Sequence, residues 1–372
     1  MKRALLLLLI CIALPLTACG SGLTLVHSGP APSVAAYADE LDGALAALME
    51  ENFDLYAAYF DEDDYRMIFE DYYGEFGGIG IRMINENGGV VIYGLFADSP
   101  AERAGLLAGD IIISVDGVPV PGDDTEQAAK MIRGDEGSTV SLTVSRDGEQ
   151  HSFTMTREII EVTNITGENL PEYYGVAYIE IESFAENTFA EFADTFNRLY
   201  AERPIETLII DLRTNGGGAL PAAINIANLF VPAGSVIVTE KTAFGETASV
   251  GDNGQLNSLR LILLQNEYTA SASEVLIGAL KDSCGALLIG TTSFGKGIAQ
   301  SIIPLSSGGG LRYTRSIYYT PSGFSLHEVG LEPDIVVETT EDISSDDYYS
   351  TDAERNPHLG AAIAYLQEQG LL

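Results

Sequence analysis

Residues that hold metal ions or form disulfide bonds are scarce in this chain of 372 residues. It has three cysteines and four histidines, and no CxxC pair or Cys/His cluster occurs. The histidines are scattered along the sequence: His27, His151, His327 and His358. A zinc hydrolase would therefore lack its usual ligands, although carboxylate sites remain open. We expect neither a metal ion nor a cofactor.

Basic residues are also few. Nineteen lysines and arginines stand against 54 aspartates and glutamates, which gives a formal net charge of −35. Such acidity repels phosphate backbones and anionic lipid head groups, so nucleic acid is not an expected partner. The chain does have an apolar fraction of 46% and no long low-complexity tract. This composition predicts a globular protein of two or three domains.

The first eighteen residues have the pattern of an export signal. Lys2 and Arg3 precede an apolar run from Ala4 to Leu16 that is too short to span a bilayer as a stable helix. The segment Leu16-Thr-Ala-Cys19 resembles a bacterial lipobox. The resemblance implies cleavage before Cys19, lipid on Cys19, and a membrane-anchored lipoprotein of the cell envelope, outside the cytoplasm. The alternative is an ordinary secretory signal with a chance cysteine.

The segments that follow are a tether and an arm. If Cys11 leaves with the signal and Cys19 is acylated, only Cys284 remains, so the mature chain has no intramolecular disulfide. Residues 19–34 are small and polar, as a tether should be. Residues 35–73 are acidic and rich in alanine and aromatic residues at helical spacing, which predicts an N-terminal arm of two or three helices. The arm is either a packing or dimerisation element, which makes a homo-oligomer possible, or a solvated spacer.

A second unit covers residues 74–157, and its most informative stretch runs from Ser99 to Gly117. Ser99 can cap a helix that begins at Pro100, and Gly105 can supply a left-handed stop. Ile111 to Val115 then reads as a strand that Asp116-Gly117 closes. This stretch resembles a PDZ domain.

The PDZ resemblance implies a peptide groove. In PDZ domains the loop before the second strand offers backbone N–H groups to the terminal carboxylate of a peptide, and here that loop is Phe76–Gly80. The implied peptide-binding residues are Gly78, Ile79, Gly80 and Ile81 on one wall and Ala128 and Ile132 on a helix at 125–132. The alternative is that the glycines only form a turn.

The third region, residues 158–341, carries a loose internal repeat. A strand at 208–212 is followed by three glycines, a helix at 219–230 and a strand at 236–238. The pattern recurs with a strand at 261–264, a helix at 272–282 and a strand at 287–289. Such units predict a layered α/β core whose loops and helix N-termini share one edge. Residues 342–372 form a C-terminal segment with a helix.

Two short segments, Thr269–Glu274 and Thr292–Gly297, each have an ordinary explanation when taken alone. Ser271-Ala-Ser-Glu274 has the form of a helix capping box. Gly290–Lys296 nearly matches a phosphate-binding P-loop, which would indicate an NTPase. That motif requires Ser or Thr after the lysine and then a helix, whereas Gly297 and an extended stretch follow here.

Three segments coincide with one family: Asp211–Gly218, Ser271–Glu274 and Phe294–Gln300. Together with the PDZ unit they resemble the C-terminal processing peptidases, or tail-specific proteases, over about residues 74 to 338. The resemblance implies a serine endopeptidase in which Ser271 is the nucleophile, Lys296 is the base and Gln300 orients the base. It implies a structural role for His327. Thr269 and Gly216 depart from the usual serine and proline of the family, and the arm is short.

The chemistry of this pair follows from general principles. A hydroxyl is a poor nucleophile until a base takes its proton, and a lysine can be that base only if desolvation lowers its pKa toward neutrality. Phe294, Ile298 and the strand at 287–289 are the apolar neighbours expected to exclude water. The oxyanion formed by attack on a carbonyl needs N–H donors, for which Ala272 and Gly217 are the candidates. Alternatively, the glycine run only forms a turn.

These observations predict a multidomain α/β fold, in which a repeated strand-loop-helix protease core of the crotonase/Clp protease type carries an inserted PDZ domain and an N-terminal helical arm. The expected function is serine endopeptidase action on protein substrates captured by their C-terminal tails. Arg133, at the end of the groove helix, is the candidate that couples tail binding to the alignment of Lys296 and Gln300. The alternatives are a catalytically silent PDZ scaffold at the cell surface and an acyl-thioester enzyme of the crotonase type.

Overall fold

The computed structural model describes residues 44, 46–47, 56–86, 88–305, 308–338 and 344–372. The chain divides into two units, residues 1–48 and 49–372. In the first unit the described residues Ala44, Ala46 and Ala47 are helical. The predicted signal, the lipid site at Cys19 and the tether lie outside the described residues. None of the helices described is long and apolar enough to cross a membrane.

The second unit begins with the end of the predicted arm. A short strand, β1 (Ala58–Phe60), is followed by the helix α3 (Glu62–Tyr73). The Asp61 side chain caps α3 by accepting the Asp64 N–H at 2.8 Å, and Gly74 ends the helix at φ 76°. The other predicted arm helices fall mainly on residues that the structure does not describe.

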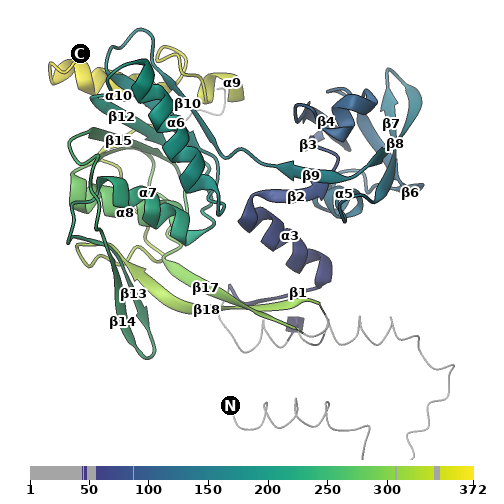
Figure 1. Ribbon diagram of the computed structural model, residues 1–372, viewed down its shortest axis with the longest axis horizontal. Helices are drawn as coiled ribbons and strands as arrows, with labels where there is room; N and C mark the ends of the chain where they lie inside the picture. Colours follow the sequence, from purple (N-terminus) through teal and green to yellow (C-terminus); the bar gives the residue numbers. More distant parts are fainter. Residues whose placement is uncertain (1–43, 45, 48–55, 87, 306–307, 339–343) are drawn as a thin grey trace, which may run out of the picture. The chain divides into compact units, whose positions relative to one another are not determined.

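A small β-rich domain follows, and the chain enters and leaves it through neighbouring strands. The entry strand β2 (Glu75–Gly78) pairs antiparallel with the exit strand β9 (Glu158–Glu161), as Figure 1 shows. An inserted domain has this arrangement. The elements between them are β3 (Ile81–Glu86), β4 (Gly89–Leu95), α4 (Pro100–Ala104), β5 (Ile111–Val115), β6 (Val118–Pro119), α5 (Thr125–Ile132), β7 (Thr139–Arg146) and β8 (Glu149–Thr156).

The sheet of this domain has the order β3-β4-β5-β7-β8, with β6 paired to β5. Its core contains buried Ile92, Leu106 and Leu142. The predicted helix at Ser99–Gly105 forms as α4: the Ser99 hydroxyl accepts the Glu102 N–H at 3.2 Å, and Gly105 has φ 89°. Among the described strands β3 pairs only with β4, so within this part of the chain one side of β3 is an open sheet edge.

The large domain is built on a central six-stranded sheet. The strand order is β10-β11-β12-β15-β16-β19, and all neighbours are parallel except the edge strand β10. These strands are β10 (Ile165–Asn169), β11 (Val176–Ile181), β12 (Thr207–Asp211), β15 (Arg260–Gln265), β16 (Leu287–Gly290) and β19 (Ile335–Val336). As the near-continuous apolar runs predict, β12 and β15 are buried on both faces.

Helices cover both faces of the central sheet (Figure 1). One face packs against α6 (Thr188–Glu202), α7 (Leu220–Phe230) and α8 (Ala272–Cys284) through side chains such as Leu208, Ile210 and Leu263. The other face presents the alternate side chains, including Ile209 and Ile262, to α10 (Pro357–Glu368). A short helix, α9 (Ser345–Tyr348), precedes α10. The α/β layering predicted from the repeat is therefore present.

The two predicted repeats differ in where their last strand goes. β16, after α8, returns to the central sheet, whereas β13 (Val236–Thr242), after α7, joins a second, antiparallel sheet. That sheet also contains β14 (Gly245–Val250), β17 (Ile298–Pro304), β18 (Gly310–Tyr319) and β1. β17 pairs with β18 over seven positions, with a bulge at Ala299/Gln300. The arm is thus joined to the sheet that carries Gln300.

Candidate active site

The predicted catalytic segments meet at the carboxyl edge of the central sheet. β12, β15 and β16 run parallel and end at Asp211, Gln265 and Gly290. The loops that follow, 212–219, 266–271 and 291–297, therefore leave the sheet on the same side. Open α/β sheets commonly bind ligands at this edge.

Ser271 occupies an unusual backbone conformation just before α8. Its φ and ψ are 59° and −116°, whereas an ordinary N-cap residue lies in the β region. A non-glycine residue held in a sparsely populated region costs roughly 1–3 kcal/mol and persists only where its surroundings determine it. The helix-cap explanation is therefore incomplete, because a simple cap does not require this strain.

The carboxylate of Glu274 holds the two predicted segments together. One oxygen, Oε2, accepts the backbone N–H of Ser271 at 2.9 Å and that of Lys296 at 2.8 Å. The other, Oε1, accepts the Ser293 hydroxyl at 2.6 Å and the Gly295 N–H at 2.7 Å. Glu274 is fully buried, and burial raises the pKa of its carboxyl even though the hydrogen bonds oppose that shift. Four donors thus satisfy one buried acid.

Lys296 is placed where its amine loses part of its hydration. Burial is the main cause that lowers the pKa of Lys296, and the nearby positive charge of Arg312 lowers it further. The amine also lies 6.0 Å from the ring centroid of Tyr56. Ile298 is 3% exposed and lines the same cavity as Lys296. Phe294 is 55% exposed and is not among the residues that line this cavity.

The Gln300 amide contacts the arm in this structure. Its Nε2 donates to the backbone carbonyl of Tyr56 at 2.8 Å. No hydrogen bond between Gln300 and Lys296 occurs in the part of the chain that the structure describes. Both residues nevertheless line the same cavity.

A cavity of about 660 Å³ brings the predicted nucleophile, base and orienting residue together. Ser271, Lys296 and Gln300 line it with Gly216 and Gly218 of the glycine run. Tyr72 of α3 and residues of α7, β13, β17 and β18 complete the wall: Leu220, Pro221, Ile224, Asn225, Glu240, Ile298, Ala299, Arg315 and Tyr318.

In contrast, Ser273 is fully buried and donates its hydroxyl proton to the Asn215 backbone carbonyl at 3.0 Å. Among the described residues, no group of three or more His, Cys, Asp or Glu side chains is arranged to hold a metal ion.

The glycine run lies against the nucleophile segment. Gly217 has φ 102°, and a Cβ there would come within 2.8 Å of the Ser271 Cβ and 2.9 Å of the Ala272 nitrogen. Only glycine fits such a close approach. The N–H of Gly217 donates to the Asn215 side chain at 2.8 Å. Ala272 is the first residue of α8, where backbone N–H groups lack partners within the helix.

Comparisons with known proteins agree with this geometry. Residues 175–337 match peptidase family S41, and residues 77–156 match the PDZ domain family. A "Carboxy-terminal-processing protease" of Bartonella bacilliformis is 35% identical over 294 residues, which cover 77% of this chain and 67% of that protein. This chain belongs to peptidase family S41.

Other S41 relatives extend the comparison. A "Carboxyl-terminal-processing protease" of Synechocystis is 38% identical over 272 residues, 71% of this chain and 63% of that protein. The chain spans about three fifths to two thirds of the length of such curated relatives. Among solved structures, a photosystem II D1 C-terminal processing protease is similar with a TM-score of 0.51 and 27% identity, over 88% of this chain and 86% of that one.

The PDZ domain of this S41 protein contains the predicted groove residues on two facing elements. Gly78 ends β2, Ile79 and Gly80 lead into β3, Ile81 begins β3, and Ala128 and Ile132 lie on α5. Ile79 and Ala128 are fully buried in the domain core, so their side chains are core residues. The N–H groups of Ile79 and Gly80 meet no acceptor among the described residues.

Arg133 ends α5 and contacts the arm. Its Nη1 lies 3.1 Å from a Glu70 carboxylate oxygen and 3.4 Å from one of Asp71, both on α3. Its guanidinium also lies 4.5 Å from the ring centroid of Phe76 on β2. A contact between the PDZ helix and α3 is therefore present, whereas no described hydrogen bond or ion pair joins Arg133 to Lys296 or Gln300.

Two further residues of the site were not predicted as functional. Glu274 was expected only as half of a capping box, yet it also binds the Lys296 segment. Asn215 is fully buried. Its side-chain amide donates to the Ile181 carbonyl at 2.7 Å, and its backbone carbonyl accepts the Ala270 N–H at 3.0 Å. The segment Asp211–Gly218 carries part of the family resemblance, but an asparagine before a glycine run reads as a turn residue, so nothing in the sequence singled out Asn215.

The substitution Glu274→Gln tests the bridge. Glutamine replaces one carboxylate oxygen with an NH₂ group, which cannot accept the two hydrogen bonds that this oxygen accepts in Glu274. The Ser271 and Lys296 segments should therefore separate. Because small misplacements of reacting groups can lower rates by about 10²-fold, labelling of Ser271 by a fluorophosphonate should slow by a factor of that order.

The control for this prediction is Glu332→Gln, since Glu332 is exposed and its side chain lies outside the site. Both variants should be compared by labelling rate and by circular dichroism. A folded Glu274→Gln protein that labels as fast as wild type would contradict the bridging role.

Proposed function

We propose that this S41 protein is a serine endopeptidase in which Ser271 attacks the substrate and Lys296 is the general base. The observation that carries the proposal is that both residues line one cavity, in which burial lowers the pKa of the Lys296 amine. The strained backbone of Ser271 and the shared Glu274 carboxylate support it, because they fix both groups on one rigid framework.

In the first half-reaction, the neutral amine of Lys296 takes the hydroxyl proton of Ser271 as its Oγ bonds to the substrate carbonyl carbon. The carbonyl oxygen becomes an oxyanion that backbone N–H groups stabilise. We assign the Ala272 N–H and the Gly217 N–H to this role. The latter would have to leave the Asn215 side chain when substrate binds.

To complete this half-reaction, the C–N bond breaks and the departing amine takes the proton from Lys296. An acyl-enzyme remains on Ser271. Water then attacks the ester, giving its proton to the neutral Lys296 amine, and the proton returns to Ser271 Oγ as the acid product leaves. Gln300 would orient Lys296 in this cycle after its amide leaves the Tyr56 carbonyl.

We further propose that the PDZ domain captures the C-terminal tail of protein substrates. β3 offers an open sheet edge to which an extended peptide can add as a strand beside α5. The N–H groups of Ile79 and Gly80, which have no acceptor in the described part of the chain, suit a terminal carboxylate. The curated names of its relatives refer to processing at the carboxy terminus.

Arg133 is the proposed link between the tail and the active site. It pairs with Glu70 on α3, and Tyr72 of the same helix lines the cavity that contains Ser271. The Tyr56 carbonyl, which precedes α3 in the chain, binds Gln300. A tail that changes the Arg133 contact could therefore move the arm and release Gln300 toward Lys296.

The catalytic assignment predicts the behaviour of two variants. Purified wild-type protein should cleave an unfolded protein substrate in the presence of a metal chelator, while Ser271→Ala and Lys296→Ala should lose cleavage by at least about 10³-fold. Fluorophosphonate should label wild type and not Ser271→Ala. Equal labelling of the two, or no cleavage by wild type, would favour a catalytically silent PDZ scaffold.

The tail assignment predicts a dependence on the free carboxylate. Cleavage of an unfolded substrate with an apolar tail should slow when the terminal carboxylate is amidated. Arg133→Ala should retain basal cleavage of a substrate without this tail but lose the tail's stimulation, measured as kcat/KM. The control is Arg198→Ala, an exposed arginine on α6 that pairs with Glu202. Unchanged stimulation in Arg133→Ala would refute the proposed coupling.

We also propose that the protein is a lipoprotein of the cell envelope, anchored through Cys19. The support is the apolar segment followed by Leu16-Thr-Ala-Cys19. Cells fed a labelled fatty acid should incorporate it into wild type and not into Cys19→Ala, as judged by gel and mass spectrometry. Equal incorporation would exclude this anchor. Self-association through the arm stays a prediction.

A further inference from the structure

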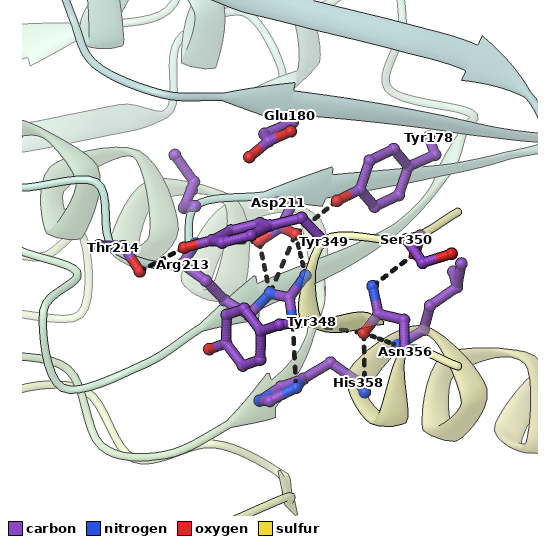
Figure 2. Close-up of polar contacts among 12 residues, drawn as sticks. Tyr178, Glu180, Asp211, Arg213, Thr214, Tyr348, Tyr349, Ser350, Asn356 and His358 are labelled. Carbon is purple, nitrogen blue, oxygen red and sulfur yellow. Dashed lines mark hydrogen bonds and ion pairs between the residues drawn. The ribbon is translucent and has the colours of Figure 1, made fainter. Parts of the chain in front are cut away.

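A buried ion pair stands at the base of the glycine loop (Figure 2). Neither of its residues lines the active-site cavity. Arg213 and Asp211 are fully buried at the end of β12, and Arg213 Nε and Nη2 donate to the Asp211 carboxylate at 2.6–3.0 Å. Asp211 also accepts the Tyr178 hydroxyl at 2.5 Å. Two of the five N–H groups of Arg213, on Nη1, point away from this pair.

The C-terminal segment supplies the partners for Nη1. Arg213 Nη1 lies 3.3 Å from Asn356 Oδ1 and 3.2 Å from His358 Nδ1. The Arg213 guanidinium also stacks 4.2 Å from the ring centroid of Tyr348 and 5.4 Å from that of Tyr349. Figure 2 shows these side chains surrounding Arg213. We call Tyr348, Tyr349, Asn356 and His358 the C-terminal clasp.

His358 is neutral in its contact with Arg213. Arg213 can only donate, so the His358 Nδ1 must accept and the ring proton must be on Nε2. His358 is fully buried, and burial followed by the charge of Arg213 lowers its pKa to about 4. The neutral ring, and with it this contact, therefore persists throughout the neutral range of pH.

The clasp also binds the loop one residue further on. The hydroxyl of Tyr349 lies 2.8 Å from Thr214 Oγ1, and Asn266 joins Thr214 to Tyr348 through its amide at 3.2 and 3.1 Å. Thr214 has φ 64°, a left-handed conformation that is strained for a β-branched residue. Such a backbone persists only where neighbouring contacts determine it. The clasp provides one contact directly, through Tyr349, and a second through Asn266, which Tyr348 binds.

From Thr214 the loop continues directly to the catalytic groups. The backbone carbonyl of Asn215 accepts the Ala270 N–H and the Ser273 hydroxyl, both at 3.0 Å. The side-chain oxygen of Asn215 accepts the Gly217 N–H. Gly217 in turn packs against the Ser271 Cβ. The path from the clasp to the nucleophile is thus a continuous run of hydrogen bonds and backbone contacts.

We propose that the C-terminal clasp is a positioning element for the active site, which acts through Arg213 and Thr214 to fix the loop that stabilises the oxyanion. None of the clasp residues lines the active-site cavity. Its effect should therefore appear in the transition state and not in substrate binding. The predicted effect of the clasp on catalysis rests on the proposed protease function.

The least disruptive test is Tyr349→Phe, which keeps the ring over Arg213 and removes the hydroxyl bond to Thr214. Loss of one such bond should lower kcat about 2- to 10-fold and leave KM unchanged. Tyr174→Phe is the matched control, because Tyr174 is 70% exposed. In a double-mutant cycle, Tyr349→Phe and Thr214→Ala together should lower kcat by less than the product of their separate effects, because the two changes share the Tyr349–Thr214 bond, while Thr214→Ala also removes the Asn266 bond to Thr214.

Hydrogen exchange provides a readout that needs no activity. In the Ser271→Ala background, Tyr349→Phe should speed amide exchange in residues 213–219 and leave exchange in the PDZ domain unchanged. Faster exchange everywhere, or unchanged exchange together with unchanged kcat, would overturn the proposal. If wild type lacks Ser271-dependent cleavage, the protease function fails, while the exchange experiment still decides whether the clasp fixes the loop.

Discussion

The buried carboxylate of Glu274 is the constraint on which the active site depends. It accepts two backbone N–H groups through one oxygen, and these belong to Ser271 and Lys296, which are 25 residues apart in sequence. Burying a carboxylate is costly unless donors satisfy it. Four donors do so here, which makes the arrangement of the two segments mutually dependent. A change in either segment leaves part of a buried acid without partners.

The sheet supplies the other constraint, because it brings distant loops to one edge. Parallel strands β12, β15 and β16 end together, so the glycine loop, the Ser271 segment and the Lys296 segment leave at the same place. Asn215 connects the glycine loop to the Ser271 segment, as Glu274 connects the latter to Lys296. The clasp then fixes the glycine loop from its far side through Arg213 and Thr214. Arm residues complete the cavity, since Tyr72 lines it and the Tyr56 carbonyl binds Gln300.

Local sequence patterns predicted what local physics determines. The Ser99 cap, the Gly105 stop and the strand at Ile111–Val115 were found where predicted, and so was the strand-loop-helix repeat around Ser271. Contacts between distant segments could not be predicted in this way. Arg213 and His358 are 145 residues apart, and no periodicity links them. The divergence of β13 from the central sheet and the Gln300 contact with Tyr56 likewise depend on tertiary packing. Phe294, a loop residue predicted to exclude water from Lys296, is 55% exposed and does not line the cavity, which the sequence could not indicate because the burial of a loop residue depends on tertiary packing.

The central claim is that Lys296 is poised to lose its proton. The chain has only five lysines, so its amines can be resolved by NMR of protein labelled with ε-¹³C lysine, and Lys296→Arg identifies the signal. Lys130 and Lys241 lie beside carboxylates that raise their pKa values, which makes them internal references. We predict that the Lys296 signal titrates below 10.5 and below the signals of Lys130 and Lys241. A Lys296 midpoint at or above 10.5 would contradict the account.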